Sequence, residues 1–324
     1  MKKELFNMIE NKLMLPEKVT IWEVCPRDGF QMERKWIPTE EKIRLIHRFV
    51  YTGIQHIEVT SFVHPKAIPQ LKDAEEVVKS IQDLTDVKFR ALIPNVKGAE
   101  RAISVGVKKL KLLLSATDSH SLSNSNATVK EAQANLLSIV DLANKSNVEV
   151  SGSIAVAFGC PFEGKVPVER LLSILEDYRK MGITEISLAD TSGSGDPKLV
   201  YDVLGIMKQE FPGFIFSMHL HNTRGMAFAN AVAALQQGVT IFDSSIAGLG
   251  GCPYAPNAAG NIASEDIVHA FHEMGIRTGI DLDKLLEAAK EVKKTIGHDG
   301  GSFLLKAGPN SKLHCKPEGQ EKLG

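Results

Sequence analysis

His219 and His221 stand two residues apart at the end of an apolar run in this 324-residue chain. Side chains alternate across a β-strand, so both imidazoles point the same way if that run is a strand. Two imidazoles on one side can share a metal ion, but histidines at a strand end also serve as hydrogen-bonded partners of neighbouring groups. The pair alone leaves both interpretations open.

Asp28 favours the interpretation as a metal site. It follows the first apolar run, in Cys25-Pro-Arg-Asp-Gly-Phe-Gln31. A carboxylate beside two imidazoles makes a mixed nitrogen and oxygen ligand set, which suits Mg, Mn, Fe or Zn. No cysteine stands beside the histidines, which argues against a thiolate zinc site. The residues therefore predict a divalent cation near Asp28, His219 and His221.

Arg27 is the second candidate for chemistry. A guanidinium near a metal can stabilise an enolate or thioester oxygen as negative charge develops. The alternative is a structural ion pair with a carboxylate such as Glu58, which lies late in the second apolar run. The two interpretations are compatible, because a buried Glu58 would orient Arg27 and balance its charge.

Cys252 lies in a glycine-rich stretch, Gly248-Leu-Gly-Gly-Cys-Pro-Tyr254. Glycines leave a loop free to move, and a thiol tuned toward neutral pH would act there as a mobile general acid or base. The residue types by themselves favour the alternative, an inert thiol in a turn. Asn261, in Ala259-Gly-Asn-Ile262, is by default a loop-capping amide.

Short apolar runs alternate with helical patterns along the whole chain. The runs are rich in Val, Ile and Phe, which is typical of strands buried on both faces. We predict strands at residues 19–24, 56–60, 88–93, 109–114, 149–157, 185–188, 215–220 and 240–243. Predicted helices include residues 39–51, 67–81, 128–143, 168–180, 197–210, 226–237 and 282–295.

Helix ends carry recognisable residues. Thr39, followed by Glu40 and Glu41, is typical of a capped helix start with an acid-rich first turn. A glycine, as at a helix C-cap, stands between helix and strand at four places, namely Gly53, Gly106, Gly182 and Gly238.

This is a series of eight β/α units, which predicts a closed (β/α)8 TIM barrel. An open, doubly wound sheet has the same alternation and is the alternative. We expect one domain over residues 1–324, with the barrel at about 17–275 and a C-terminal helical extension and tail at about 276–324. The polar end, 298–324, is expected to be flexible.

A TIM barrel would gather the candidate residues on one face, because the carboxyl ends of its strands converge where the chemistry occurs. Arg27 and Asp28 follow the first predicted strand, and Asp190 follows the sixth. His219 and His221 close the seventh.

Composition excludes several classes of protein. Hydrophobic residues make up 43%, charged residues 24%, and the formal net charge is -1, which indicates no nucleic-acid surface. No stretch approaches the ~20 apolar residues of a membrane span. The charged N-terminus lacks the apolar run of a signal peptide. Four well-separated cysteines without a CxxC pair indicate reduced thiols, so we expect a cytoplasmic protein.

The chain resembles the hydroxymethylglutaryl-CoA lyase family, within the metal-dependent TIM-barrel lyases and Claisen-type synthases, from about Val19 to Ala289. The matching stretches are Pro26-Arg-Asp-Gly29 with Gln31, Glu58-Val-Thr-Ser-Phe62 with Pro65-Lys66, Gly159-Cys-Pro-Phe-Glu163, Ile186-Ser-Leu-Ala-Asp-Thr191, His219-Leu-His221, Asp243–Tyr254, and Gly260-Asn261 with Glu265-Asp266. The run from Ala247 to Tyr254 is specific, since the wider superfamily generally lacks this cysteine loop.

The resemblance implies roles for the matched residues. The ligands of a divalent cation, Mg or Mn, would be Asp28, His219, His221 and Asn261. Arg27 would stabilise the enolate of the departing acetyl-CoA.

It further implies that Cys252 takes part in proton transfer. Glu58 and Asp190 would support the reacting groups from near the metal, and Gln31 and Ser61 would line the site.

The activity implied is carbon–carbon cleavage of 3-hydroxy-3-methylglutaryl-CoA to acetoacetate and acetyl-CoA, a retro-Claisen (retro-aldol-type) step of leucine catabolism. Expected partners are an acyl-CoA or hydroxy-acid substrate and further copies of the chain, as a dimer or higher oligomer, with no nucleic acid and no membrane.

The chain departs from the family pattern at Cys25, usually Gly, at Met32, usually Asn, and at Asn222, usually Asp. In the segment 123–126, Ser-Asn-Ser-Asn, it lacks a lysine that the family usually carries near CoA. Losing that cation would weaken a pyrophosphate contact. One alternative is therefore a lyase or aldolase of the same superfamily for another hydroxy-acyl-CoA or hydroxy acid. Another is a catalytically silent barrel that binds a ligand or partner.

Overall fold

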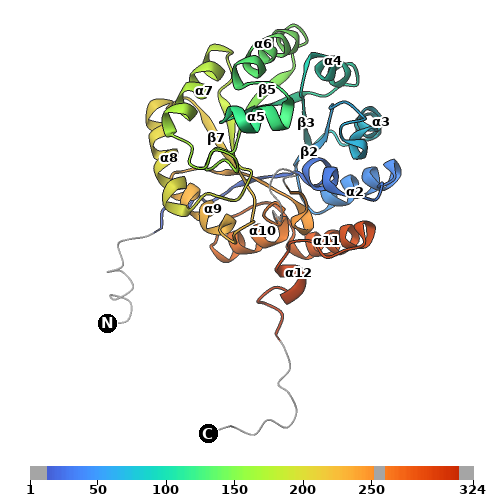
Figure 1. Cartoon of the computed structure of the whole chain (residues 1–324). Coiled ribbons are helices and arrows are strands. Elements are labelled where there is room, and N and C mark those ends of the chain that lie inside the picture. Colours follow the sequence, from blue (N-terminus) through green and yellow to red (C-terminus); the bar gives the residue numbers. More distant parts are fainter. Residues whose placement is uncertain (1–12, 252–259, 314–324) are drawn as a thin grey trace, which may run out of the picture.

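A closed barrel of parallel strands forms the centre of the molecule, with helices around it (Figure 1). The computed structural model describes residues 13–251 and 260–313. The strands in barrel order are β1 (Thr20–Glu23), β2 (His56–Ser61), β3 (Lys88–Leu92), β4 (Lys109–Ser115), β5 (Glu149–Ala155), β6 (Glu185–Asp190), β7 (Ile215–Leu220) and β8 (Ile241–Ser244). Because β1 pairs with both β2 and β8, the predicted TIM barrel is confirmed over the open sheet.

The described helices bury one face against the strands. They are α2 (Thr39–Tyr51), α3 (Ala74–Ser80), α4 (Val96–Ser104), α5 (Asp118–Ser125), α6 (Val129–Lys145), α7 (Val168–Lys180), α8 (Pro197–Glu210), α9 (Ala227–Gln236), α10 (Ser264–Glu273), α11 (Leu282–Ile296) and α12 (Leu304–Ala307). In α2, for example, Leu45, Ile46 and Phe49 are fully buried at helical spacing. No helix of the described part is both long and apolar enough to cross a bilayer.

The helix predicted at 67–81 is wrong at its start. The chain makes a short 3-10 turn, Pro69–Leu71, before α3 begins. The Lys42 ammonium donates a hydrogen bond to the carbonyl oxygen of Gln70. In a continuous α-helix that oxygen would instead accept the backbone N–H four residues further along.

The capping prediction at α2 is also corrected. Thr39 is the first helical residue, and Pro38 precedes it at the cap with no side-chain hydrogen bond. The acid-rich first turn of Glu40 and Glu41 is confirmed. The four glycines between helix and strand all have positive φ, as at Gly53 with φ 99°.

Part of the tail expected to be flexible is packed against the barrel instead. The Gly301 N–H donates to the Ala247 carbonyl at 2.8 Å. The Asp266 carboxylate accepts from the Ser302 hydroxyl at 3.0 Å and from the Leu304 N–H at 2.8 Å. Asp266 thus satisfies the open N-terminal end of α12 and ties it to α10.

Two buried carboxyl groups hold the turn after β8. Glu23 accepts the Ile246 N–H at 3.0 Å and the Ser264 hydroxyl, and Glu265 accepts the Ala247 N–H at 3.1 Å. Ala247 has the left-handed φ of 59°, which is unusual outside glycine. Burial raises the pKa of Glu23 to about 8 and that of Glu265 to about 7.

These raised pKa values predict a pH-dependent stability. Between the ordinary glutamate pKa, near 4.5, and about 8, the folded chain binds more protons at Glu23 than the unfolded chain does. The free energy of unfolding should therefore fall as pH rises through this window, by up to roughly 1.4 kcal/mol per pH unit. Urea unfolding at pH 5 and pH 8 should show a smaller loss in Glu23→Gln than in wild type. The exposed Glu149→Gln should keep the wild-type loss, and an unchanged loss in Glu23→Gln would contradict the prediction.

Candidate active site

A π-helical turn presents the first two site residues. After β1 the N–H groups of Arg27, Asp28 and Gly29 all converge on the Val24 carbonyl, at 3.1, 2.7 and 3.3 Å. Such wide turns are rare and occur frequently at functional sites. The turn sets Arg27 and Asp28 side by side at the carboxyl end of the barrel.

Asp28, His219 and His221 bring three donor atoms together. The two Nε2 atoms lie 3.1 Å apart, and Asp28 Oδ2 lies 3.7 and 3.8 Å from them. The point equidistant from the three atoms is about 2.1 Å from each, within the usual range of metal–nitrogen and metal–oxygen bonds. All three side chains are buried. This donor set fits a divalent cation.

Asn261 joins the cluster through a segment that crosses the strand ends. Asn222 N donates to Gly260 O at 3.0 Å, and Ile262 N donates to Leu220 O at 2.9 Å. The Asn261 amide nitrogen then donates to Asp28 Oδ2 at 2.6 Å. Its oxygen Oδ1 is buried without a hydrogen-bond partner. A buried carbonyl oxygen left unpaired is costly, and a cation beside Asp28 would satisfy it.

Gly250 makes this close packing possible. Its φ is +113°, and a Cβ atom there would lie 2.4 Å from the Asn261 amide nitrogen. Any side chain would displace Asn261, so the position requires glycine.

Asp243 determines which ring nitrogen of His219 carries the proton. His219 Nδ1 lies 3.1 Å from Asp243 Oδ2, and Asp243 also accepts from Arg90 at 2.7 Å and Lys111 at 2.8 Å. Burial alone would raise the pKa of Asp243, but the two cations hold it well below its usual value. The ionised carboxylate of Asp243 therefore accepts a hydrogen bond from the Nδ1–H of His219. The Nε2 lone pair of His219 is left facing the cluster, as a metal ligand requires.

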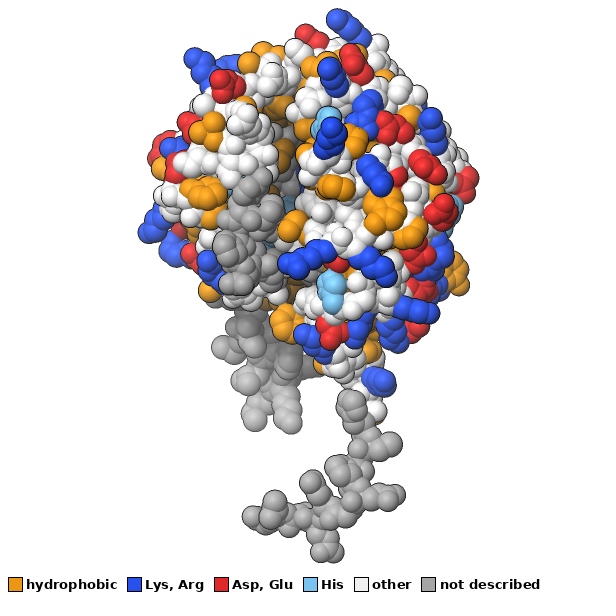
Figure 2. All heavy atoms as spheres, turned by 45° about the vertical axis from the view of Figure 1, so that its right-hand side comes forward, with side chains coloured by type: hydrophobic (Ala, Val, Ile, Leu, Met, Phe, Trp, Pro, Cys, Tyr) orange, Lys and Arg blue, Asp and Glu red, His pale blue; other side chains and the backbone are white. Residues whose placement is uncertain are grey.

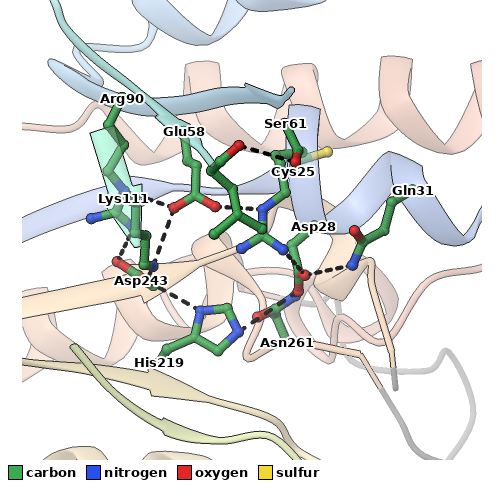
Figure 3. Close-up of polar contacts among 12 residues, drawn as sticks. Cys25, Asp28, Gln31, Glu58, Ser61, Arg90, Lys111, His219, Asp243 and Asn261 are labelled. Carbon is green, nitrogen blue, oxygen red and sulfur yellow. Dashed lines mark hydrogen bonds and ion pairs between the residues drawn. The ribbon is translucent and has the colours of Figure 1, made fainter. Parts of the chain in front are cut away.

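Arg27 is clamped by two carboxylates. Its Nε donates to Glu58 and its Nη1 to Asp28. The other oxygen of Glu58 accepts from Arg90 at 2.7 Å and lies 3.2 Å from Lys111 Nζ (Figure 3). Burial alone would lower the pKa of Arg27, but Asp28 and Glu58 outweigh it and the pKa is raised. Arg27 therefore stays charged in a fixed orientation.

The cluster opens into a cavity of about 580 Å³ across the barrel mouth. Arg27, Asp28 and the two histidines line one side, and the ends of β3, β4 and β5 with α5 line the other. On the outer surface, lysines and arginines alternate with acidic side chains over the face in Figure 2, without a patch of one sign.

Comparison with known proteins identifies the family of this chain. The HMGL-like family model matches residues 18–292. The chain belongs to the HMGL-like family. A hydroxymethylglutaryl-CoA lyase of Bacillus subtilis is 44% identical over 87% of this chain and 94% of its own length. The human mitochondrial hydroxymethylglutaryl-CoA lyase is 40% identical, covering 90% of each chain. The solved structure of an Acinetobacter baumannii HMG-CoA lyase with coenzyme A and 3-methylmalate superposes with a TM-score of 0.89, at 42% identity, over 93% of this chain and 98% of that one.

Three residues that support the site were not predicted from the sequence of this HMGL-like chain. They are Arg90, Lys111 and Asp243, which are joined by hydrogen bonds. A signal was present. Arg90 and Lys111 interrupt apolar runs that were predicted to be buried on both faces. A charged side chain in such a strand needs a buried partner of opposite charge.

The structure places Gln31 and Ser61 in the lining of the cavity. Gln31 donates to Asp28 Oδ1 at 2.8 Å and faces the cavity. Ser61 donates to the Leu92 carbonyl at 3.1 Å and also faces the cavity. Gln31 thus orients the Asp28 carboxylate, which would bind the cation.

Asp190 is not one of the three donors that lie together. Its carboxylate accepts the N–H groups of Ser194 at 2.8 Å and Gly195 at 3.1 Å, which shapes the loop between β6 and α8. Burial raises the pKa of Asp190. Its support of the reacting groups stays a prediction. Cys252 lies outside the described residues.

Proposed function

We propose that this chain is a divalent-metal-dependent carbon–carbon lyase that cleaves 3-hydroxy-3-methylglutaryl-CoA to acetoacetate and acetyl-CoA. The observation that carries the proposal is the buried triangle of Asp28, His219 and His221 beside the fixed cation of Arg27, within one cavity. Support also comes from relatives named hydroxymethylglutaryl-CoA lyase, 40 to 44% identical over most of the chain.

The cation would be held by Asp28, His219, His221 and Asn261, and we propose Mg or Mn. Bound there, it would lower the pKa of the substrate's tertiary hydroxyl group. Burial alone would raise the pKa of Asp28, but Arg27 and the two imidazoles outweigh it and keep the pKa low. Asp28 therefore remains an anionic ligand across the ordinary pH range.

The cleavage separates charge in a way that the site residues can support. A base removes the tertiary hydroxyl proton, and the oxygen electrons form the ketone of acetoacetate. The bond between C2 and C3 breaks, and its electron pair moves onto the thioester carbonyl oxygen as an enolate. Arg27 supplies the permanent positive charge for that oxygen. A proton delivered to the enolate carbon completes acetyl-CoA.

We assign that proton transfer to Cys252, which follows the last described residue of its loop, Gly251. Glu58 and Gln31 position the reacting groups, since Glu58 binds Arg27 and Gln31 binds Asp28. Ser61 faces the substrate from β2.

The deciding experiment follows acetyl-CoA release from 3-hydroxy-3-methylglutaryl-CoA in the presence of Mg²⁺ or Mn²⁺. We expect metal-dependent release that EDTA abolishes and added metal restores. No release under conditions in which the Bacillus subtilis relative is active would overturn the proposed substrate. Absence of both metal binding and turnover would favour a silent barrel. A Cys252→Ala variant with full rate would remove the thiol from the mechanism.

A second candidate, a lyase for another hydroxy-acyl-CoA or hydroxy acid, is favoured by one observation. Among the described residues that line the cavity, Arg27 and Lys111 are the only arginine and lysine, and both are paired with buried carboxylates. The segment 123–126 faces the cavity with hydroxyl and amide groups alone. A higher kcat/KM for a different acyl thioester than for the proposed substrate would favour this candidate.

We further propose a cytoplasmic protein that assembles as a homodimer or higher homo-oligomer. Cys25 and Cys160 are buried free thiols, which suits a reducing compartment.

A further inference from the structure

The cavity wall opposite the metal cluster contains a buried histidine that the proposed mechanism does not use. His120 lies in α5, which is nearer to the barrel axis than α6 (Figure 1). Its Nδ1 lies 2.8 Å from the Ser115 hydroxyl, at the carboxyl end of β4. Both residues line the same cavity as Asp28 and His219, and they are only 2% and 4% exposed. Residues at this end of a barrel strand are where TIM-barrel enzymes contact their substrates.

Both the ring and the backbone of His120 are held in place. The Ser115 hydroxyl hydrogen-bonds ring nitrogen Nδ1, and the Thr117 hydroxyl, which caps α5, accepts the backbone N–H of His120 at 3.4 Å. A side chain fixed in this way loses little conformational freedom when it binds a ligand. Burial lowers the pKa of His120, so the ring is neutral at physiological pH and combines one donor with one acceptor.

Among the described lining residues, α5 and α6 contribute no lysine, arginine, aspartate or glutamate that could form an ion pair with a ligand. The polar side chains that α5 and α6 contribute to the same cavity lining carry hydroxyl and amide groups, as in Ser121, Asn124 and Asn135. Arg27 and Lys111, the only arginine and lysine among the described lining residues, are already held in ion pairs with the buried carboxylates Glu58 and Asp243. A ligand group meeting the His120 wall would therefore be recognised by neutral hydrogen bonds rather than by ion pairs.

We propose that His120, oriented by Ser115, determines substrate specificity by hydrogen-bonding an uncharged amide group of the pantetheine arm that carries the acyl thioester. This inference rests on the proposed function, because it assigns the pantetheine arm of the same substrate to the wall opposite the metal. The acyl head, with its hydroxyl and carboxylate, belongs to the cation, and the thioester carbonyl faces Arg27. The cavity joins the two walls, so one substrate can meet both.

The test compares variants that remove or retain the polar group. His120→Phe keeps an aromatic ring but loses both nitrogens, and we expect KM to rise about tenfold with kcat within about twofold of wild type. His120→Gln keeps a neutral donor and acceptor at similar reach and should recover most of the lost affinity. Ser115→Ala, which frees the ring to rotate, should fall between them. His47→Phe, a half-buried histidine of α2 outside the cavity, is the matched control.

A shortened substrate locates the contact. The same acyl group on pantetheine, without the nucleotide, should show the same loss in His120→Phe, because the proposed contact lies on the acyl-pantetheine portion. A loss confined to the full CoA ester would place the contact on the nucleotide and overturn the proposal. A lowered melting temperature with unchanged KM would make His120 a structural residue and would also overturn it.

Binding measured without turnover separates this inference from the proposed function. Calorimetry with 3-methylglutaryl-CoA, which lacks the hydroxyl group that must be deprotonated, reports affinity alone. If wild type binds this analogue but does not cleave 3-hydroxy-3-methylglutaryl-CoA, the lyase proposal fails. Weaker binding of the analogue by His120→Phe would then still support the specificity role. If wild type is an active lyase and His120→Phe binds the analogue as tightly, the specificity role alone fails.

Discussion

Replacing Asp28 by alanine should abolish both cleavage and tight metal binding. The carboxylate supplies one of the three donor atoms of the cluster, at 3.7 and 3.8 Å from the Nε2 atoms of His219 and His221. A bound metal ion contributes several kcal/mol of charge stabilisation, so the rate should fall by roughly 10³-fold or more. Mn²⁺ binding, measured by calorimetry or by electron paramagnetic resonance, checks the metal independently of activity.

The matched control is Asp141→Ala, an exposed aspartate on α6. It should keep wild-type activity and metal affinity. The Asp28→Ala variant should remain folded, because Arg27 keeps its bond to Glu58. Retention of stoichiometric, tight Mn²⁺ binding by Asp28→Ala would show that Asp28 is not a ligand.

Replacing Arg27 by glutamine should remove most of the turnover while leaving metal binding intact. In the proposed mechanism the guanidinium faces the developing enolate, and the loss of one such donor typically lowers kcat by roughly 10²–10³-fold. The two carboxylates that Arg27 binds keep other partners. Glu58 retains Arg90 at 2.7 Å, and Asp28 retains Gln31 at 2.8 Å. The loss should therefore appear in kcat rather than in stability.

Steady-state kinetics with saturating Mn²⁺, together with a Mn²⁺ titration, checks this separation. Arg34→Gln, an exposed arginine a few residues further along the chain, is the control and should behave as wild type. An Arg27→Gln enzyme that retains the wild-type kcat would limit Arg27 to an ion-pair role. Equal losses of kcat and metal affinity would mean that Arg27 acts by orienting Asp28.

The barrel and the central donors were predictable from the sequence because their signals are local. Buried parallel strands are short apolar runs, so most strand bounds were predicted to within two residues. The His219 and His221 pair required only the alternation of side chains along one strand. Asp28 and Arg27 required only that they follow a strand, since strand ends meet on one face of a TIM barrel.

The contacts that support those donors could not be predicted, because they join residues far apart in the chain. Arg90 and Asp243 are 153 residues apart in the chain, and Asn261 and Asp28 are 233 apart, yet each pair is hydrogen-bonded. Such partners become neighbours only when β1 and β8 close the barrel. Sequence patterns report the burial of a residue, but not which buried charge it meets.

The direction in which a polar side chain points was likewise decided by packing. Asp190 follows a strand as Asp28 does, but its carboxylate caps the N–H groups of its own loop. His120 carries no motif, and only the position of α5 over the cavity brings it into the lining. The sequence was enough to predict the barrel and the residue types of a candidate metal site. The closed barrel decided which charges neutralise one another and which wall of the cavity a substrate meets, because both depend on contacts between strands distant in the chain.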